Sequence, residues 1–517
     1  MRNKIFGALL LTLALAGCRK ESSTVLSYAF KDDMAFEEAD SSFAAKFDVM
    51  WNGLNCNYAL WDFEKEHGLD WDQVYDTYRP KFEELDKVDT LVSDKQLSEL
   101  LTKVVAPLHD GHLNVQMKNH HSGGTVAVSP GATRVLSERK EELMQALSFN
   151  PASSIQLFYQ PNGYLLDYKH SNSLPLLSIL EKVRDYVVDQ ANALEEKEHL
   201  TPEETRLLEA YKGFLQDYRE NLLPLLTRGS EKALEYYNKM VLRYEYLSLP
   251  GLVAVNEKLL NYNMDITYAL FKDNIAYLRI SGFKVCPFVK YTEEIFGKDI
   301  DPDTQAIIDA VKAVWAGWFG AIQEHHAKGD LGGVIIDVRS NGGGMIADYP
   351  FVFGALLPSG GFRVTDARFK RGPGRYDYSP VLPQTMSTYE EEHATVTEPI
   401  VVLCNCYSVS MAEQTSMSAK LLENATLIGT RTWGGLSALA SNESYSGNYA
   451  GHTGVEGETA VYCYTPGEVV ISQDGKILEG YGIEPDIEVA FDVAAWDKGT
   501  GPDNQLDAAL QHIRSKK

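Results

Sequence analysis

The sequence predicts an α/β protein, with a mixed, largely parallel sheet and helices preceded by an N-terminal helical region and a helical insertion. Three observations predict this fold class. Apolar residues recur with a helical period before residue 108, residues 175–246 are again helical in composition, and strand and helix patterns alternate from residue 264 onward. Strands that alternate with helices need crossover connections, and these connections make a sheet largely parallel.

The N-terminal region, residues 40–108, has the pattern of amphipathic helices. A later helix of this region begins at Ser93, and Gln96 stands three residues on, which is the spacing of a capping box. This helix leads into residues 109–112, which read His-Asp-Gly-His. The first helix places one apolar stripe on Phe43, Phe47, Met50, Trp51 and Leu54.

Residues 175–246 are rich in Leu, Glu, Lys and Tyr and predict further helices. Thr201 is the expected N-cap of one of them, with Pro202 at the first helical position and Glu204 at the third. The stretch carries no catalytic motif of its own. We interpret it as a helical insertion or lid.

The region from residue 264 onward contains continuous apolar runs that predict buried strands at 275–280, 334–338, 399–404 and 425–429. A long helix is expected between the first two runs. The second run ends in a glycine-rich turn at 339–344, and the third ends in a serine-containing turn at 408–410. Reactive groups of parallel sheets gather outside the carboxyl ends of the strands, so both turns are expected at one edge of the sheet.

The composition excludes several classes of protein. A chain of 517 residues is about three times the usual domain length, so a disulfide-stapled miniprotein is excluded. The hydrophobic fraction of 44% is that of a globular protein. The formal net charge of −24, without a Lys- or Arg-rich run, predicts no nucleic-acid partner, because such a surface repels phosphates.

The first residues resemble a bacterial lipoprotein signal. Arg2 and Lys4 precede an apolar run over 5–16, which is shorter than the roughly 20 residues that span a bilayer, and Cys18 follows. Lipidation of Cys18 predicts a membrane partner and a bacterial cell envelope location outside the cytoplasm, periplasmic or on the cell surface. An ordinary secretory signal is the alternative. The expected segments are a signal peptide (1–17), a tether (18–35), the N-terminal helical region (36–118), the helical insertion (119–263) and the α/β core (264–517).

The other five cysteines form no CxxC pair and no metal-ligand framework. We expect all of them to be small buried apolar residues. They are Cys56, Cys286, Cys404, Cys406 and Cys463.

Two turns in the α/β region offer groups for acyl transfer. Ser410 stands immediately before a predicted helix, where unpaired N–H groups can hold a developing oxyanion. Ser408 is a rival, and a purely structural reading makes Ser410 the N-cap of this helix with Glu413 completing a capping box. The glycines at 342–344 can bring an N–H close to a bound carbonyl, or they form a plain flexible turn.

Four motifs together resemble the C-terminal processing peptidases and tricorn core proteases. They are GGVIIDVRSNGGG, the nucleophile segment PIVVLCNCYSVSMAEQTSMSAKLLENATLIGTRTWGG, the closing motif LEGYGIEPDIEV and the upstream motif LHDGH. Their order and spacing match the family over roughly residues 40–118 and 265–495. The resemblance implies that Ser410 is the nucleophile and that the N–H groups of Gly343 and Met411 form the oxyanion hole.

The general base separates two branches of this family. Processing peptidases use a lysine 25 residues after the serine, and here that position is Gly435. The tricorn-like branch uses an N-terminal histidine, so the resemblance implies His112 as the base, and an imidazole suits this role near neutral pH. His109 is the fallback. A metal pair of His109 and His112 is disfavoured, because no clear third ligand lies nearby in the sequence.

Glu479 in the closing motif is the candidate acid that orients the histidine, directly or through water, and a surface carboxylate on a turn is the other reading. The tricorn-like pattern has a serine beside the histidine, whereas this chain has Gly111. Lys420 is the only lysine between Ser410 and Gly435, and its position in the helix predicts that it points away.

The sequence thus predicts a lipid-anchored serine endopeptidase that acts on peptides or unfolded proteins and needs no cofactor or metal. It shows no clear PDZ-type carboxylate-binding loop between residues 113 and 264. One alternative is a catalytically inactive relative that binds peptide or another ligand in the same cleft. Another is a glycan-binding surface lipoprotein, suggested by 28 tyrosines and 7 tryptophans.

Overall fold

The computed structural model describes residues 42–148, 176–226, 252–255, 266–271, 273–280, 282–371, 374–437, 452–454, 456–492 and 503–516, with three single residues between 233 and 240. The chain forms two compact units. The first contains residues 1–138, 365–384 and 434–480, and the second contains 139–364, 385–433 and 481–517. The predicted signal peptide, the tether and Cys18 lie outside the described residues.

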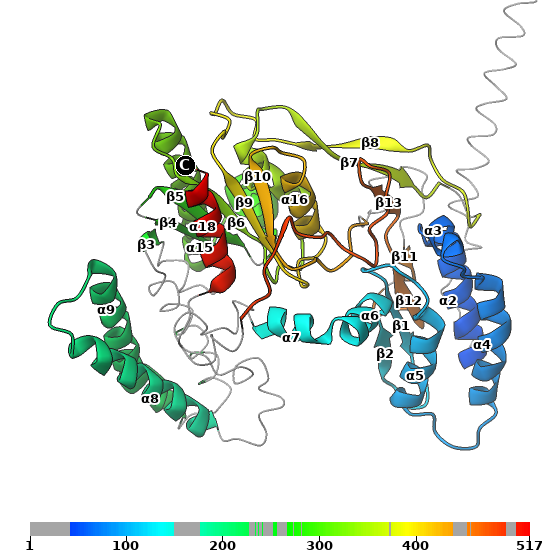
Figure 1. Ribbon diagram of the computed structural model, residues 1–517. Coiled ribbons are helices and arrows are strands. Elements are labelled where there is room, and N and C mark those ends of the chain that lie inside the picture. The colour runs from blue at the N-terminus through cyan, green and yellow to red at the C-terminus, as the bar shows by residue number, and fades with distance from the viewer. Residues whose placement is uncertain are drawn as a thin grey trace, which may run out of the picture. The chain divides into compact units, whose positions relative to one another are not determined.

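The first unit is helical over the predicted N-terminal region, and one of its helices begins directly after Ser93, as the sequence predicts (Figure 1). Ser93 caps one helix and forms the predicted capping box with Gln96. The apolar stripes of these helices are buried in one core with strand residues of the same unit. The helices are α2 (Phe43–Asn57), α3 (Trp61–Glu66), α4 (Trp71–Asp86), α5 (Asp94–Val105) and α6 (Pro130–Glu138).

A four-stranded sheet completes the first unit, in the order β11-β12-β1-β2. Its central pair is antiparallel and joins residues far apart in the chain, with Val115 opposite Cys463. In β1 the burial alternates, as expected for a strand with one face on the core. The strands are β11 (His452–Thr453), β12 (Val461–Tyr464), β1 (Asn114–Lys118) and β2 (Thr125–Val128).

Two long strands, β7 (Gly361–Phe369) and β8 (Leu382–Ser387), carry the chain from one unit into the other and back. Within the first unit, β13 (Glu468–Ile471) pairs antiparallel with residues 366–369 of β7.

The predicted insertion contains α7 (Lys140–Ser148), α8 (Leu176–Glu195), α9 (Pro202–Asp217), a π-helical turn η3 (Tyr218–Leu222) and α10 (Leu223–Leu226). Thr201 caps α9 through a capping box with Glu204, as the sequence predicts. Helices α8 and α9 and the turn η3 share a small core of their own, which includes Val187, Phe214 and Leu222. The interpretation of the insertion as a lid stays a prediction.

A seven-stranded sheet forms the centre of the second unit, in the order β14-β10-β9-β6-β5-β4-β3. The pairs from β14 to β5 are parallel, and β4 and β3 add antiparallel strands at one edge. This mixed, largely parallel sheet confirms the predicted fold class. The strands are β3 (Leu252–Val255), β4 (Ile266–Phe271), β5 (Ile275–Ile280), β6 (Gly333–Asp337), β9 (Ile400–Cys404), β10 (Ala425–Gly429) and β14 (Ile487–Glu488).

Every residue of β5, β6 and β9 is buried, because helices cover the faces of this sheet. The predicted long helix is α15 (Pro302–Lys328), which packs on β4 and β5. α16 (Met411–Ala419) packs on β9 and β10, and so does α18 (Asn504–Ser515), drawn in red in Figure 1. Shorter helical segments are α13 (Cys286–Val289), α14 (Thr292–Phe296), η5 (Ile346–Phe351) and η6 (Gly354–Leu356).

A buried ion pair joins the end of β6 to the start of α18. The Arg339 guanidinium donates to both carboxylate oxygens of Asp337 and to both of Asp503, at 2.6–2.9 Å. Burial alone would raise the pKa of Asp337, but Arg339 outweighs it and holds this pKa below its usual value. Removing one partner of such a pair leaves an uncompensated buried charge and costs about 3–5 kcal/mol. The first residue of the glycine-rich turn is therefore fixed by α18.

The five described cysteines are free thiols. Four are buried, as predicted, whereas Cys56 is half-buried. Burial raises the pKa of Cys286 and of Cys406 to about 12, so these two thiols stay protonated and behave as apolar residues. Among the described residues, no helix has the length and apolarity needed to cross a membrane.

Candidate active site

Ser410 occupies a strained turn between β9 and α16. Its backbone has φ +59° and ψ −115°, a conformation that residues with a Cβ rarely adopt. Strain of this kind costs about 1–3 kcal/mol and persists where the surrounding structure enforces it, often at functional sites. The Ser410 N–H donates to Glu413 Oε2 at 3.3 Å, and Ser410 is the N-cap of α16 in a capping box with Glu413, so the structural role predicted for Ser410 is also present.

The rival serine, Ser408, has a structural role. It is fully buried, and its hydroxyl donates to the carbonyl oxygen of Val338 at 2.8 Å. The same hydroxyl oxygen accepts the N–H of Asn405 at 3.0 Å. A hydroxyl engaged on both sides is poorly suited to attack a substrate. The geometry thus favours Ser410 over Ser408 as the nucleophile.

Glu413 supports the Ser410 turn from inside the protein. Its carboxylate is fully buried and accepts the Thr432 hydroxyl at 2.6 Å. The Thr432 oxygen in turn accepts the N–H of Ile483 at 2.7 Å. Glu413 therefore joins the serine turn to the segments after β10 and before β14. The sequence placed this acid three residues after Ser410 but gave no sign of its partner 19 positions away.

The glycine-rich turn lies directly against Ser410. Gly343 has φ +92°, and a Cβ on this residue would lie 2.6 Å from the Cβ of Ser410 and 3.2 Å from its Oγ. The turns after β6 and β9 meet at the carboxyl edge of the sheet, as expected. The Met411 N–H belongs to the first turn of α16 and lacks an intrahelical acceptor. The Gly343 N–H, however, donates to the side-chain oxygen of Asn341 at 2.8 Å.

The Lys420 ammonium is bonded away from the Ser410 turn. Its ammonium donates to Asp486 Oδ1 at 2.5 Å and to the carbonyl oxygen of Glu484 at 3.0 Å. This agrees with the expectation that Lys420 points away from the serine.

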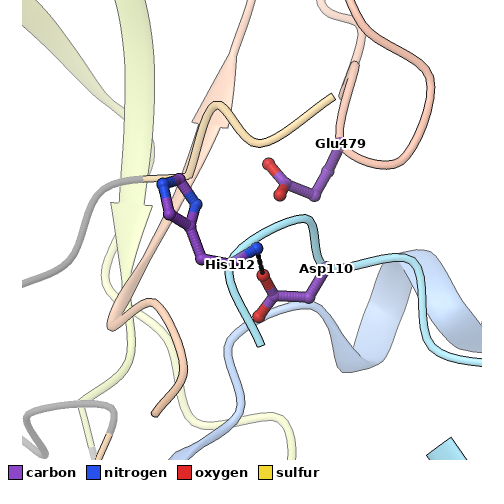
Figure 2. A group of neighbouring side chains, drawn as sticks. All are labelled: Asp110, His112 and Glu479. Carbon is purple, nitrogen blue, oxygen red and sulfur yellow. Dashed lines mark hydrogen bonds between the residues drawn. The ribbon is translucent and has the colours of Figure 1, made fainter. Parts of the chain in front are cut away.

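The first unit contains the other candidate residues in one cluster. Asp110, His112 and Glu479 each offer a side-chain atom within 4.8 Å of the others, and a ring nitrogen of His112 is turned toward the Glu479 carboxylate (Figure 2). Asp110 is fully buried, and its Oδ1 accepts the N–H groups of His112 at 2.7 Å and Leu113 at 3.0 Å. The structure therefore brings together two predicted residues, His112 and Glu479, with Asp110, which sequence reasoning did not select.

Burial sets the protonation of this cluster. It lowers the pKa of His112 to about 4, so the imidazole is neutral at neutral pH and able to accept a proton. The Nδ1 atom of His112 is buried and has no hydrogen-bond partner. Burial also raises the pKa of Asp110 well above its usual value, and the nearby Glu479 raises it further.

Glu479 is a buried residue, not a surface carboxylate. Burial raises its pKa, and N–H donors oppose that effect. Its Oε1 accepts the N–H of Gly111 at 2.8 Å, while Oε2 accepts those of Leu436 at 3.0 Å and Ser437 at 2.8 Å. The carboxylate thus holds the turn before His112 against the segment after Gly435. A sequence of one chain could suggest the acid but not these partners.

The two positions at which this chain departs from the family pattern, Gly111 and Gly435, lie against each other. A Cβ on Gly111 would lie 2.4 Å from the carbonyl oxygen of Gly434 and 2.6 Å from the Cα of Gly435. The residue beside the histidine and the residue at the lysine position therefore pack backbone against backbone. This contact leaves no room for the serine that the tricorn-like pattern places at position 111.

His109, the fallback base, is engaged elsewhere. Its Nδ1 lies 2.7 Å from Glu64 Oε2, and its N–H donates to Glu64 Oε1 at 2.7 Å. The ring of Phe63 packs edge-on against it. His112 is therefore the better candidate of the two histidines.

Comparisons with known proteins agree with the resemblance. Residues 274–489 match the family model for Peptidase family S41. The Tricorn protease of Thermoplasma acidophilum is 29% identical over 181 residues, which are 35% of this chain and 14% of that protein. The Tricorn protease of Thermoplasma volcanium is 23% identical over 191 residues, 37% of this chain and 15% of the relative. The matched stretches thus span about one seventh of these relatives.

A solved structure, mature CPAF, is 12% identical and matches 95% of this chain and 98% of its own with a TM-score of 0.44. The match of residues 274–489 identifies a domain of peptidase family S41, a family of serine hydrolases, and confirms the resemblance predicted from the motifs.

Proposed function

We propose that this protein is a serine endopeptidase that hydrolyses peptide bonds with Ser410 as nucleophile and His112 as general base. The observation that carries the proposal is the strained Ser410 turn, which holds the Ser410 side chain against Gly343 at the carboxyl edge of the sheet. The family supports peptides or proteins as substrates.

The proposed reaction is acyl transfer to water. Ser410 Oγ attacks the substrate carbonyl while His112, neutral because burial lowers its pKa to about 4, accepts the hydroxyl proton. His112 then protonates the leaving amine, and water releases the acyl group from Ser410. Glu479 stabilises the imidazolium that forms, since a ring nitrogen of His112 is turned toward it. Because Ser410 and His112 belong to different units, the reaction requires the two residues to meet in the active enzyme.

The Met411 N–H is the proposed donor to the oxyanion, since it opens α16 without an intrahelical acceptor. The second predicted donor, the Gly343 N–H, is bonded to Asn341 in this structure. Its participation stays a prediction.

Localisation is part of the proposal. The basic start, short apolar run and Cys18 support a lipid-anchored protein of a bacterial cell envelope, outside the cytoplasm. There it would meet secreted or unfolded polypeptides.

The test uses a fluorophosphonate probe on the intact protein, with the labelled residue identified by mass spectrometry. We expect labelling at Ser410, its loss in Ser410→Ala and in His112→Ala, and its retention in the control His109→Ala. Labelling that maps to another serine would refute the nucleophile. A folded protein that is never labelled but binds denatured casein would support the inactive, peptide-binding relative instead.

One observation favours glycan binding as a second function. A cavity of about 320 Å³ in the first unit is lined by aromatic, cationic and acidic side chains, the groups that stack on and hydrogen-bond sugars. Tyr376 at this cavity is 46% exposed. Binding on a glycan array that Tyr376→Ala abolishes would support this function. The lining residues include Trp61, Lys65, Trp71, Asp72, Arg375 and Tyr376.

A further inference from the structure

Asn341 lies between the two turns that meet at Ser410. It follows β6 by four residues and is fully buried. Its side-chain N–H donates to the carbonyl oxygen of Ile280 at 2.9 Å, at the end of β5. Its side-chain oxygen accepts the Gly343 N–H at 2.8 Å, and its main-chain oxygen accepts the Val409 N–H at 2.9 Å.

These three hydrogen bonds join three separate segments. Ile280 ends a neighbouring strand, Gly343 packs against Ser410, and Val409 immediately precedes Ser410. One buried residue therefore links the glycine turn to the nucleophile turn, with its side chain bonded to Ile280 and Gly343 and its main-chain oxygen bonded to Val409. Catalytic groups must hold their geometry closely, since a displacement of 1 Å can cost about 10²-fold in rate.

The preceding residue reinforces this arrangement. Ser340 has φ +55°, and its N–H donates to the side-chain oxygen of Asn405 at 2.9 Å. The Ser340 hydroxyl donates to the carbonyl oxygen of Ala146 in α7 at 2.7 Å. The turn before Asn341 is thus fixed from both sides, so the orientation of Asn341 is set by its surroundings.

We propose that Asn341 is a positioning residue for the reaction at Ser410, acting through the Gly343 amide, and this rests on the proposed function. In this role the bond from Gly343 to Asn341 is retained during catalysis. The opposite role would be inhibitory, with Asn341 occupying an N–H that the oxyanion needs. The two roles predict opposite signs for the loss of the side chain.

The test compares Asn341→Ala and Asn341→Asp with the control Asn424→Ala. Asp keeps an oxygen for the Gly343 N–H but loses the donor to Ile280. Asn424 also uses its side chain to bond two carbonyl oxygens, those of Val396 and Glu398, but it stands just before β10, at the opposite edge of the sheet. The measurements are kcat and KM on a fluorogenic peptide, and exchange of the Gly343 amide by mass spectrometry with fragmentation to single residues.

We expect Asn341→Ala to lower kcat about 10²-fold with KM changed less than threefold, and to speed exchange at Gly343. Asn341→Asp should recover at least part of kcat and of the protection, and Asn424→Ala should change neither. An unchanged or increased kcat in Asn341→Ala would overturn the proposal, and so would unprotected Gly343 in the unsubstituted protein. If the unsubstituted protein hydrolyses nothing, the proposed function fails, whereas the exchange measurement still decides whether Asn341 holds the turn.

Discussion

Replacing Gly343 by alanine tests the contact between the glycine turn and the nucleophile. The new Cβ would lie 2.6 Å from the Ser410 Cβ and 2.9 Å from the carbonyl oxygen of Val409, whereas ordinary contact begins near 3.4 Å. The two turns must therefore separate by about 0.8 Å. In addition, φ +92° strains any residue with a Cβ, at a cost of about 1–3 kcal/mol.

A separation of this size should lower kcat/KM of Gly343→Ala at least about 10²-fold. Two control variants test the backbone strain and the added Cβ separately from the contact with Ser410. Gly360→Ala adds the backbone strain, at φ +130°, with no atom within 4 Å, and Gly342→Ala adds a Cβ in open space without a positive φ.

The assay measures steady-state hydrolysis of a fluorogenic peptide and the rate of fluorophosphonate labelling, with thermal unfolding as the check on folding. Gly342→Ala should retain full activity, and Gly360→Ala should lose stability without losing kcat. A Gly343→Ala protein that folds and keeps kcat/KM within threefold would refute the reasoning.

Four further predictions concern the histidine cluster and the anchor. The acid limb of kcat/KM should have its midpoint near pH 4, the pKa of His112, instead of near 6.5; a midpoint near 6.5 that is unchanged in Glu479→Gln would contradict the buried imidazole. The same lowered pKa makes the unfolded chain bind the extra proton between pH 6.5 and 4, so stability should fall as the pH is lowered through this window and level off below it, as followed by urea unfolding. Glu479→Gln places an amide N–H₂ against N–H donors and should lower kcat at least about 10²-fold, whereas the exposed Glu484→Gln should not; equal activity of both variants would remove Glu479 from the mechanism. Cys18→Ser should abolish partitioning into the Triton X-114 detergent phase, whereas Cys56→Ser should not, and a Cys18→Ser protein that still partitions would exclude lipidation as its cause.

The α/β sheet could be predicted because its signals are local. The runs at 334–338 and 399–404 are apolar throughout, which is the pattern of strands buried on both faces, and each ends in residues typical of turns. Ser410 and Gly343 follow from the same reasoning, since the carboxyl ends of neighbouring parallel strands share one edge.

The pairings between distant segments could not be predicted. The residues paired between β1 and β12 are about 350 positions apart, and neither segment carries a signal that names the other. The same holds for Glu479, whose carboxylate accepts the N–H of Gly111 across 368 positions. The hydrogen bond from the Gly343 N–H to the Asn341 side chain could not be predicted for a different reason. An asparagine next to glycines is equally typical of an ordinary turn.

The buried pair of Arg339 and Asp503 has a consequence for the order of events during synthesis. Asp503 follows Arg339 by 164 positions. The Arg339 guanidinium therefore lacks this partner until the segment with α18 has left the ribosome. Until then the glycine turn lacks one of its anchors. During synthesis, therefore, the nucleophile emerges from the ribosome before the segment that completes this anchor of the catalytic edge.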